Sequence, residues 1–277
     1  MTEKDRPEIG ATVDAGGVQT NYLEDGSGPP VVFIHGSGPG VTAYANWRLV
    51  LPVLADRFRV LAPDMAGFGF SERPEKGDYG VDLWTEQLVG FLDALDIRRA
   101  SVVGNSFGGA IALRLAARYP DRVDKLVLMG SMGIDFEITE GLDRVWGYEP
   151  SFANMRRVLD VFAHDRGLVP DELAEVRYRA SMQPGFQESY AAMFPAPRQR
   201  WVDAMRTADD EIRALPHRTL IVHGREDQVI PVDNSLRLMR LVRNGDLHVF
   251  ANCGHWVQIE RSADFTQLVA GFLASER

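Results

Sequence analysis

The sequence predicts an α/β fold with a mostly parallel central sheet that is flanked by helices and carries an inserted helical cap. Three observations predict it. Short apolar runs that end in turns alternate with amphipathic helical segments along most of the 277 residues. These runs are continuously apolar, which is typical of strands covered on both faces. One long stretch in the second half breaks the alternation, because all its patterns are helical.

Six apolar runs are expected to form buried strands: 31–36, 59–64, 100–105, 125–130, 219–224 and 247–250. Helical periodicity predicts helices that separate or follow them, at 82–95, 108–118, 234–242 and 265–273. The helix at 108–118 should end before Pro120, because proline disfavours the helical conformation of the residue before it. This alternation favours parallel strands joined by right-handed crossovers.

The stretch 134–213 interrupts the pattern. It offers amphipathic segments at 151–162, 171–180 and 186–193, and no convincing strand. A string of core helices would give the same pattern, but the stretch is longer than an ordinary crossover, which favours a cap. The predicted organisation is a core of residues 1–133 and 214–277 with a helical cap of residues 134–213.

Composition and charge exclude several classes of protein. The formal net charge is −9 and there is no block of Lys and Arg, so we expect no nucleic-acid partner. The apolar runs are far shorter than the ~20 residues of a membrane helix, so we expect no membrane partner. The N-terminal residues lack the apolar segment of a signal peptide, and the only cysteine, Cys253, has no disulfide partner in the chain. These features favour a cytoplasmic protein.

The segment Gly104-Asn105-Ser106-Phe107-Gly108 carries the strongest chemical signal. It follows a predicted strand and precedes a predicted helix, which is the context of the G-x-S-x-G nucleophile elbow of the α/β-hydrolase fold. Glycines are needed there because the turn is tight, and the turn lifts the Ser106 hydroxyl toward the positive end of the helix. A glycine-rich turn without chemistry is the alternative, which this context disfavours.

A serine nucleophile needs a base, and in this fold the acid and then the histidine follow the serine along the chain. His255 follows the run 247–250, where the base belongs, and Asp227 follows the run 219–224, where the acid belongs. Glu226 and Asp135 are alternative acids, but the G-R-E-D-Q-x-x-P pattern around residue 227 favours Asp227. Of the other histidines, His223 ends a strand and is expected to be structural.

The loop HGSGPG at 35–40 follows the first predicted buried strand. In an α/β hydrolase the backbone N–H of Ser37 in this loop and that of Phe107 would form the oxyanion hole. A glycine-rich loop could also bind phosphate, but this one lacks both the G-K-[ST] of a P-loop and a full G-x-G-x-x-G.

Four segments together resemble the meta-cleavage-product hydrolases, which cleave carbon–carbon bonds in bacterial aromatic degradation: HGSGPG at 35–40, GNSFGG at 104–109, GREDQVIP at 224–231 and CGHW at 253–256. The cap segments TEGLDRVWGYEPSF and PGFQESYAAMFPAPRQRW, at 139–152 and 184–201, are most similar to the 2-hydroxymuconate-semialdehyde hydrolase branch, and so is APDMAGFGFSERP at 62–74. The resemblance covers nearly the whole chain.

The resemblance implies hydrolysis of a 2-hydroxy-6-oxohexa-2,4-dienoate to 2-hydroxypenta-2,4-dienoate and a small carboxylic acid. It implies no metal or organic cofactor, and a homodimer or larger homo-oligomer. His255 would deliver a proton to C5, so that the leaving fragment departs as a stabilised dienolate. Ser106 would then attack the C6 carbonyl or activate a water for that attack.

The same resemblance implies the residues that bind the dienoate. Arg177 would bind the substrate carboxylate, with Asn46, Asn105 and Trp256 as companions and Arg179 as the rival arginine. Candidate wall residues of the pocket are Trp146, Phe162, Met132, Val202 and Ile230. Because Met132 is bulky, we expect a small C6 substituent, hydrogen or methyl, in preference to phenyl.

Two other functions remain open at this point. A general carboxylesterase would use the same triad, but the polar set around Arg177 argues against it. A non-catalytic ligand receptor on the same fold would not need to keep Ser106, Asp227 and His255 together.

Overall fold

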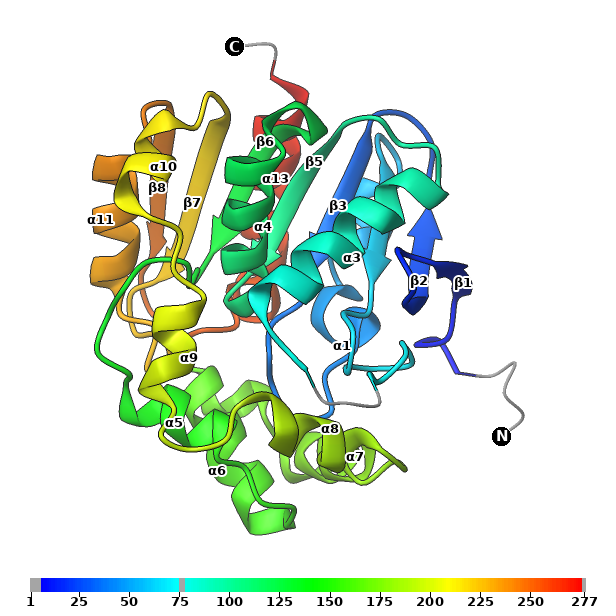
Figure 1. Cartoon of the computed structure of the whole chain (residues 1–277). Coiled ribbons are helices and arrows are strands. Elements are labelled where there is room, and N and C mark those ends of the chain that lie inside the picture. The colour runs from blue at the N-terminus through cyan, green and yellow to red at the C-terminus, as the bar shows by residue number, and fades with distance from the viewer. Residues whose placement is uncertain (1–5, 75–77, 276–277) are drawn as a thin grey trace.

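A computed structural model describes residues 6–74 and 78–275, and it confirms the α/β-hydrolase fold (Figure 1). The eight-stranded sheet has the order β1-β2-β4-β3-β5-β6-β7-β8. The strands are β1 (Ala11–Asp14), β2 (Gln19–Asp25), β3 (Pro30–Ile34), β4 (Arg59–Pro63), β5 (Ala100–Asn105), β6 (Val123–Met129), β7 (Arg218–Gly224) and β8 (Gly245–Phe250). Pairs from β4 to β8 are parallel, whereas β1 with β2 and β2 with β4 are antiparallel.

The six predicted strands are all present, and β1 and β2 are the two that the patterns did not predict. The reason is visible in their burial. β3 is buried along nearly its whole length, whereas β1 at the edge of the sheet is largely exposed. Only the middle of β2 is buried, and a partly exposed strand needs no continuous apolar run, so it leaves a weaker signal in the sequence.

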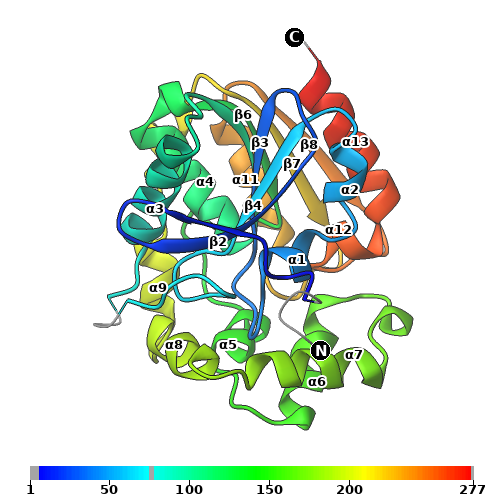
Figure 2. The ribbon, with the colours of Figure 1, turned by 90° about the vertical axis from the view of Figure 1, so that its right-hand side faces the viewer.

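The α-helices form two groups, of which one covers the two faces of the sheet and the other forms the cap. They are α1 (Ala43–Trp47), α2 (Leu51–Leu54), α3 (Val81–Ala94), α4 (Phe107–Arg118), α5 (Glu140–Trp146), α6 (Phe152–Phe162), α7 (Asp171–Ser181), α8 (Phe186–Met193), α9 (Gln199–Ala204), α10 (Asp209–Ala214), α11 (Val232–Leu241), α12 (Val257–Glu260) and α13 (Ser262–Ala274). Figure 2 shows α3 and α4 on one side of the sheet and α2 and α13 on the other.

The continuous apolar runs are explained by this two-sided cover. In β3, Val32 and Ile34 join the larger core cluster with α3 and α4, whereas Val31 and Phe33 join a second cluster with α1, α2 and α13. Successive side chains point to opposite faces of a strand, so every position of a central strand must be apolar.

The cap lies between β6 and β7 in the chain and covers one end of the sheet (Figures 1 and 2). The stretch 134–213, described in full, is helical and contains no strand, and α6, α7 and α8 match the three predicted segments. Serine and threonine caps begin two cap helices: Ser151 accepts a hydrogen bond from Asn154 N, and Thr139 accepts one from Leu142 N.

The last helix of the predicted cap region lies elsewhere. Helix α10 contacts α4 and α11, which belong to the layer on the sheet, so the helices over the end of the sheet are α5 to α9. Within the part of the chain that the structure describes, no helix combines the length and the apolar character needed to cross a membrane.

Candidate active site

The candidate site lies at the carboxyl ends of the parallel strands. β3, β5, β7 and β8 lead into the loops that hold Ser37, Ser106, Asp227 and His255. Parallel strands place their carboxyl ends at one edge of the sheet, and in open α/β sheets ligands bind outside that edge. The cap covers the same edge, so residues that are more than a hundred positions apart meet beneath it.

The elbow is built as the sequence predicts. Ser106 directly precedes α4 and has φ 54° and ψ −114°, a positive φ that is uncommon for a residue with a side chain. Its N–H donates to Met129 O at 2.9 Å, and its carbonyl accepts from Gly109 N at 2.9 Å. A Cβ at Gly104 would overlap the backbone of Gly108. The neighbouring strand and helix therefore hold the serine in its strained conformation.

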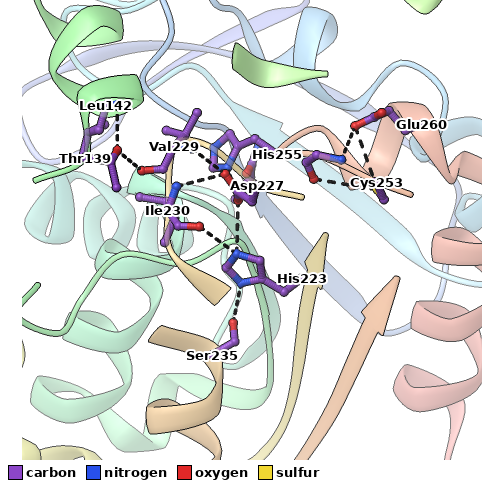
Figure 3. Close-up of polar contacts among 12 residues, drawn as sticks. Thr139, Leu142, His223, Asp227, Val229, Ile230, Ser235, Cys253, His255 and Glu260 are labelled. Carbon is purple, nitrogen blue, oxygen red and sulfur yellow. Dashed lines mark hydrogen bonds and ion pairs between the residues drawn. The ribbon is translucent and has the colours of Figure 1, made fainter. Parts of the chain in front are cut away.

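Asp227 and His255 form a buried hydrogen-bonded pair (Figure 3). His255 Nδ1 donates to Asp227 Oδ2 at 2.7 Å, which leaves His255 Nε2 as the nitrogen that can accept a proton. The other oxygen, Asp227 Oδ1, accepts from Val229 N at 2.7 Å and from Ile230 N at 2.9 Å. Burial alone would raise the pKa of Asp227, but the charge of His255 and the hydrogen bonds from His223 and His255 outweigh it and hold that pKa well below its ordinary value.

The two alternative acids have other partners. Asp135 pairs with Arg237 at 2.9 Å on the surface, and this ion pair lowers the pKa of Asp135. Glu226 accepts from Cys253 N at 3.0 Å and pairs with Arg225 at 2.7 Å. Of the three carboxylates, it is Asp227 that accepts the hydrogen bond from His255.

The two predicted oxyanion-hole residues are buried next to the serine. Among residues 6–74 and 78–275, neither Ser37 N nor Phe107 N donates to a protein acceptor, so both N–H groups are available to a ligand. The loop around Ser37 is fixed from the cap, because Trp146 Nε1 donates to Ser37 Oγ at 2.9 Å and the Tyr190 hydroxyl donates to Ser37 O at 3.1 Å.

A cavity of about 200 Å³ opens above the elbow. Residues of the core line the side of the cavity toward the sheet, and residues of the cap line the opposite side. Its lining comprises Glu8, Gly36, Ser37, Gly38, Val41, Tyr44, Ala45, Asn46, Arg48, Asn105, Ser106, Leu142, Val145, Phe162, Leu173, Val176, Arg177, Val229, His255, Trp256, Gln258 and Ile259. The structure thus brings Ser106 and His255 to one cavity together with five of the predicted binding residues.

Several polar groups of this lining lack a protein partner. Asn105 Nδ2 donates to Asn46 Oδ1 at 3.0 Å, but Asn46 Nδ2 and Asn105 Oδ1 are buried without a partner among the described residues. The same holds for Arg177 Nε and for both amide atoms of Gln258. Buried polar groups without partners cost stability, so this cluster suits a polar ligand. Gln258 carried no motif signal in the sequence.

The charges on the cavity wall favour an anion. Burial, together with the charge of the nearby Arg48 guanidinium, lowers the pKa of Arg177 to about 10, so Arg177 stays charged at neutral pH. Glu8 contributes one carboxylate against these two guanidinium groups. The rival Arg179 points away, since 76% of its side chain is exposed and it pairs with Glu175.

Four predicted wall residues lie outside the cavity lining. Met132, Trp146, Val202 and Ile230 are each at most 2% exposed and belong to the hydrophobic core cluster that surrounds the cavity. The lining instead includes Leu142, Val145 and Val229, which the sequence did not single out. The substrate contacts of the four residues stay predictions.

The cap is fastened to the loop that carries His255. The Phe162 ring at the end of α6 stacks on the His255 ring, with 5.7 Å between the ring centroids, and on the Trp256 ring, with 4.9 Å between the centroids. The Glu260 carboxylate accepts from Gly254 N at 2.7 Å and from His164 N at 2.9 Å, so one side chain joins the loop to the cap. No sequence pattern predicted this contact.

Two further groups near the site are inert. His35 is buried: its Nδ1 donates to Gly36 O at 2.7 Å and its Nε2 accepts from Met65 N at 2.9 Å. Burial lowers the pKa of His35 to about 4. Burial raises the pKa of the Cys253 thiol to about 12, which suits a packed thiol better than a nucleophile.

The fold and the site together define the class of the protein, which is a hydrolase with a serine nucleophile. Residues 29–262 match the family model described as alpha/beta hydrolase fold. The chain is 63% identical to a 2-hydroxymuconate semialdehyde hydrolase of Pseudomonas sp. (strain CF600), over 97% of this chain and 95% of that protein. It is 60% identical to a 2-hydroxy-6-oxo-2,4-heptadienoate hydrolase of Pseudomonas putida F1, over 97% of this chain and 98% of that protein.

Among solved structures, a meta-cleavage product hydrolase from Pseudomonas fluorescens IP01 matches with a TM-score of 0.96 and 57% identity, covering 97% of this chain and 98% of that one. The protein therefore belongs to the α/β-hydrolase fold family and, within it, to the meta-cleavage product hydrolases. This confirms the family that the four motifs resemble.

Proposed function

We propose that the protein hydrolyses a carbon–carbon bond in 2-hydroxy-6-oxohexa-2,4-dienoate-type ring-fission products that carry hydrogen or a small alkyl group at C6. The observation that carries the proposal is the cavity itself, where Ser106 and His255 share a wall with the unpartnered polar atoms of Asn46, Asn105 and Arg177. The names of the relatives at 63% and 60% identity describe the same substrate class.

The lining suits the two halves of such a substrate. Arg177 and the two asparagines offer charge and hydrogen bonds to the carboxylate and the enol oxygen at C2. Leu142, Val145 and Phe162 offer apolar surface to the diene and the C6 substituent. A simple ester would leave the buried Arg177 without its counter-ion, which disfavours a general carboxylesterase.

The triad then supplies the proton transfers. The Asp227 carboxylate holds His255 with Nδ1 protonated, so that Nε2 can take a proton and later deliver it. Transfer of the enol proton to C5 gives the keto tautomer, whose C5–C6 bond can break because the leaving fragment becomes a stabilised dienolate. Ser106, or a water that Ser106 and His255 activate, adds to the C6 carbonyl.

The N–H groups of Ser37 and Phe107 would stabilise the oxyanion that this addition forms. Cleavage of the C5–C6 bond leaves 2-hydroxypenta-2,4-dienoate, and the C6 carbon departs as a carboxylic acid after one water has been consumed. Formate would result from a hydrogen at C6, and acetate from a methyl group.

The size of the cavity favours a small C6 group. At about 200 Å³ it lies below the ~300–1,000 Å³ of ordinary ligand pockets. Met132 is fully buried and does not line the cavity, so its role in excluding a phenyl ring stays a prediction from the sequence.

Kinetics on substrates with hydrogen, methyl, ethyl and phenyl at C6 test the proposal. Ring-fission products are yellow, so their bleaching reports turnover directly. We expect the highest kcat/KM for hydrogen or methyl. Highest kcat/KM for phenyl would overturn the size argument, and turnover of p-nitrophenyl esters without bleaching would overturn the substrate class.

We further propose that the protein is cytoplasmic and forms a homodimer or larger homo-oligomer, as the sequence and the family resemblance lead us to expect. Light scattering on the purified protein measures its mass in solution, and a monomer would contradict the second point.

A further inference from the structure

A second imidazole contacts the candidate catalytic carboxylate. His223, the penultimate residue of β7, places its Nε2 3.2 Å from Asp227 Oδ2, the same oxygen that accepts from His255 (Figure 3). The His223 side chain is fully buried and 1% of the Asp227 side chain is exposed. The mechanism described above gives His223 no role.

Its surroundings determine which nitrogen of His223 carries the proton. Nε2 lies 3.0 Å from Ile230 O as well as near Asp227 Oδ2, so it faces two acceptors and must be the N–H. Nδ1 lies 2.6 Å from Ser235 Oγ, whose hydroxyl can donate to it. Ser235 is on α11, so the imidazole links this helix to the Asp227 loop.

The carboxylate is thereby held on every side. Oδ1 accepts two backbone N–H groups, from Val229 and Ile230, and Oδ2 accepts the two imidazoles. Without His223, the His255 N–H would be the one donor among the described residues left to fix the position of Oδ2. The carboxylate could then rotate away from the direction in which His255 needs it.

We propose that His223, oriented by Ser235, is a positioning residue for the Asp227–His255 pair. It acts through Asp227 and does not touch the substrate. Its N–H fixes Oδ2 in line with His255 Nδ1, and it shares the negative charge of the carboxylate. The proposal rests on the catalytic role assigned to this pair under the proposed function.

Removal of the donor should have two effects. Looser positioning of the carboxylate should lower kcat about tenfold, as the loss of one hydrogen bond to a charged group does. The negative charge then falls more heavily on His255, which stabilises its protonated form. The acid limb of the kcat/KM profile should therefore move upward by about half a pH unit.

Two variants separate the donor from the packing. His223→Phe fills a similar volume but has no N–H, so it should show both effects. His223→Gln keeps an N–H at about the distance of Nε2, and it should restore most of kcat and the original acid limb. His217→Phe is the matched control, because His217 is also buried but bonds Pro120 O, away from the site.

An unchanged kcat and acid limb in His223→Phe would overturn the proposal, and so would a His223→Gln variant as impaired as His223→Phe. Nitrogen-15 NMR of histidine-labelled wild-type protein tests the geometry without any variant. A proton on His223 Nδ1 in place of Nε2 would also overturn it.

Failure of the proposed function gives a different result. In that case wild-type protein would not bleach ring-fission products at all. Hydrolysis of p-nitrophenyl acetate would still report on the pair of Asp227 and His255, and the same variants could be compared by that assay.

Discussion

Replacing Asp227 with asparagine tests the geometry of the site most directly. The backbone N–H groups of Val229 and Ile230 both point at Oδ1, so the amide oxygen of an asparagine must take that place. Its NH₂ group then occupies the place of Oδ2 and faces His255 Nδ1. A donor at this position forces Nδ1 to accept, so the proton of His255 moves to Nε2.

The expected loss follows from that tautomer. With a proton on Nε2, His255 cannot take the proton of Ser106 or of the enol. The same exchange in a serine-protease triad lowers kcat about 10⁴-fold, which corresponds to about 5 kcal/mol in the activation free energy. The new NH₂ also faces the His223 N–H, and two opposed buried donors should cost about 1–3 kcal/mol of folding stability.

Bleaching of the C6-methyl ring-fission product measures kcat, and urea unfolding measures stability. Asp135→Asn is the matched control, because Asp135 is the exposed carboxylate that the sequence offered as an alternative acid. We expect that control to keep full activity. If the kcat of Asp227→Asn lies within tenfold of the wild-type value, Asp227 does not set the tautomer of His255 and the reasoning is refuted.

Three further predictions follow from the same geometry. Ser106→Ala should lose most turnover while it still binds the substrate, as a spectral titration would show; near-normal turnover would contradict its role as nucleophile. Arg177→Gln should raise KM at least tenfold through loss of the charged contact, whereas Arg179→Gln should not, because Arg179 lies on the surface. The lowered pKa of His35, about 4, makes folding acid-sensitive: the unfolded state binds the proton from about pH 6.5 downward and the folded state only near pH 4. The difference in the free energy of unfolding between wild type and His35→Gln should therefore shrink by about 3 kcal/mol between pH 7 and pH 4. Urea unfolding at both pH values measures this difference, and an equal difference at the two pH values would contradict the prediction.

The sequence by itself determined the architecture of the core and the order of the candidate triad. Each central strand must be apolar at every position because helices cover both faces, and this leaves a continuous run that can be recognised without a structure. Ser106 and Asp227 each follow such a run, and His255 follows the shorter apolar run of the edge strand β8. Parallel strands bring their carboxyl ends to one edge, so the sequence order alone predicts that these residues approach one another.

The partly exposed strands β1 and β2 and the short helices α5 and α9 escaped prediction, because partly exposed or short elements carry little periodicity. The packing of the cap also decided which side chains reach the cavity. Arg177 and Arg179 are two residues apart on α7, and two helical steps place them on nearly opposite faces. The orientation of the helix against the core alone makes Arg177 the one that lines the site.

Tertiary structure likewise distinguished Asp227 from Glu226, replaced several expected wall residues with Leu142 and Val145, and brought His223 against the carboxylate. The physical reason is the same throughout. A strand or an elbow is encoded by neighbouring residues, whereas these contacts depend on how segments far apart in the chain pack together. Their side chains carry no local pattern that records the partner.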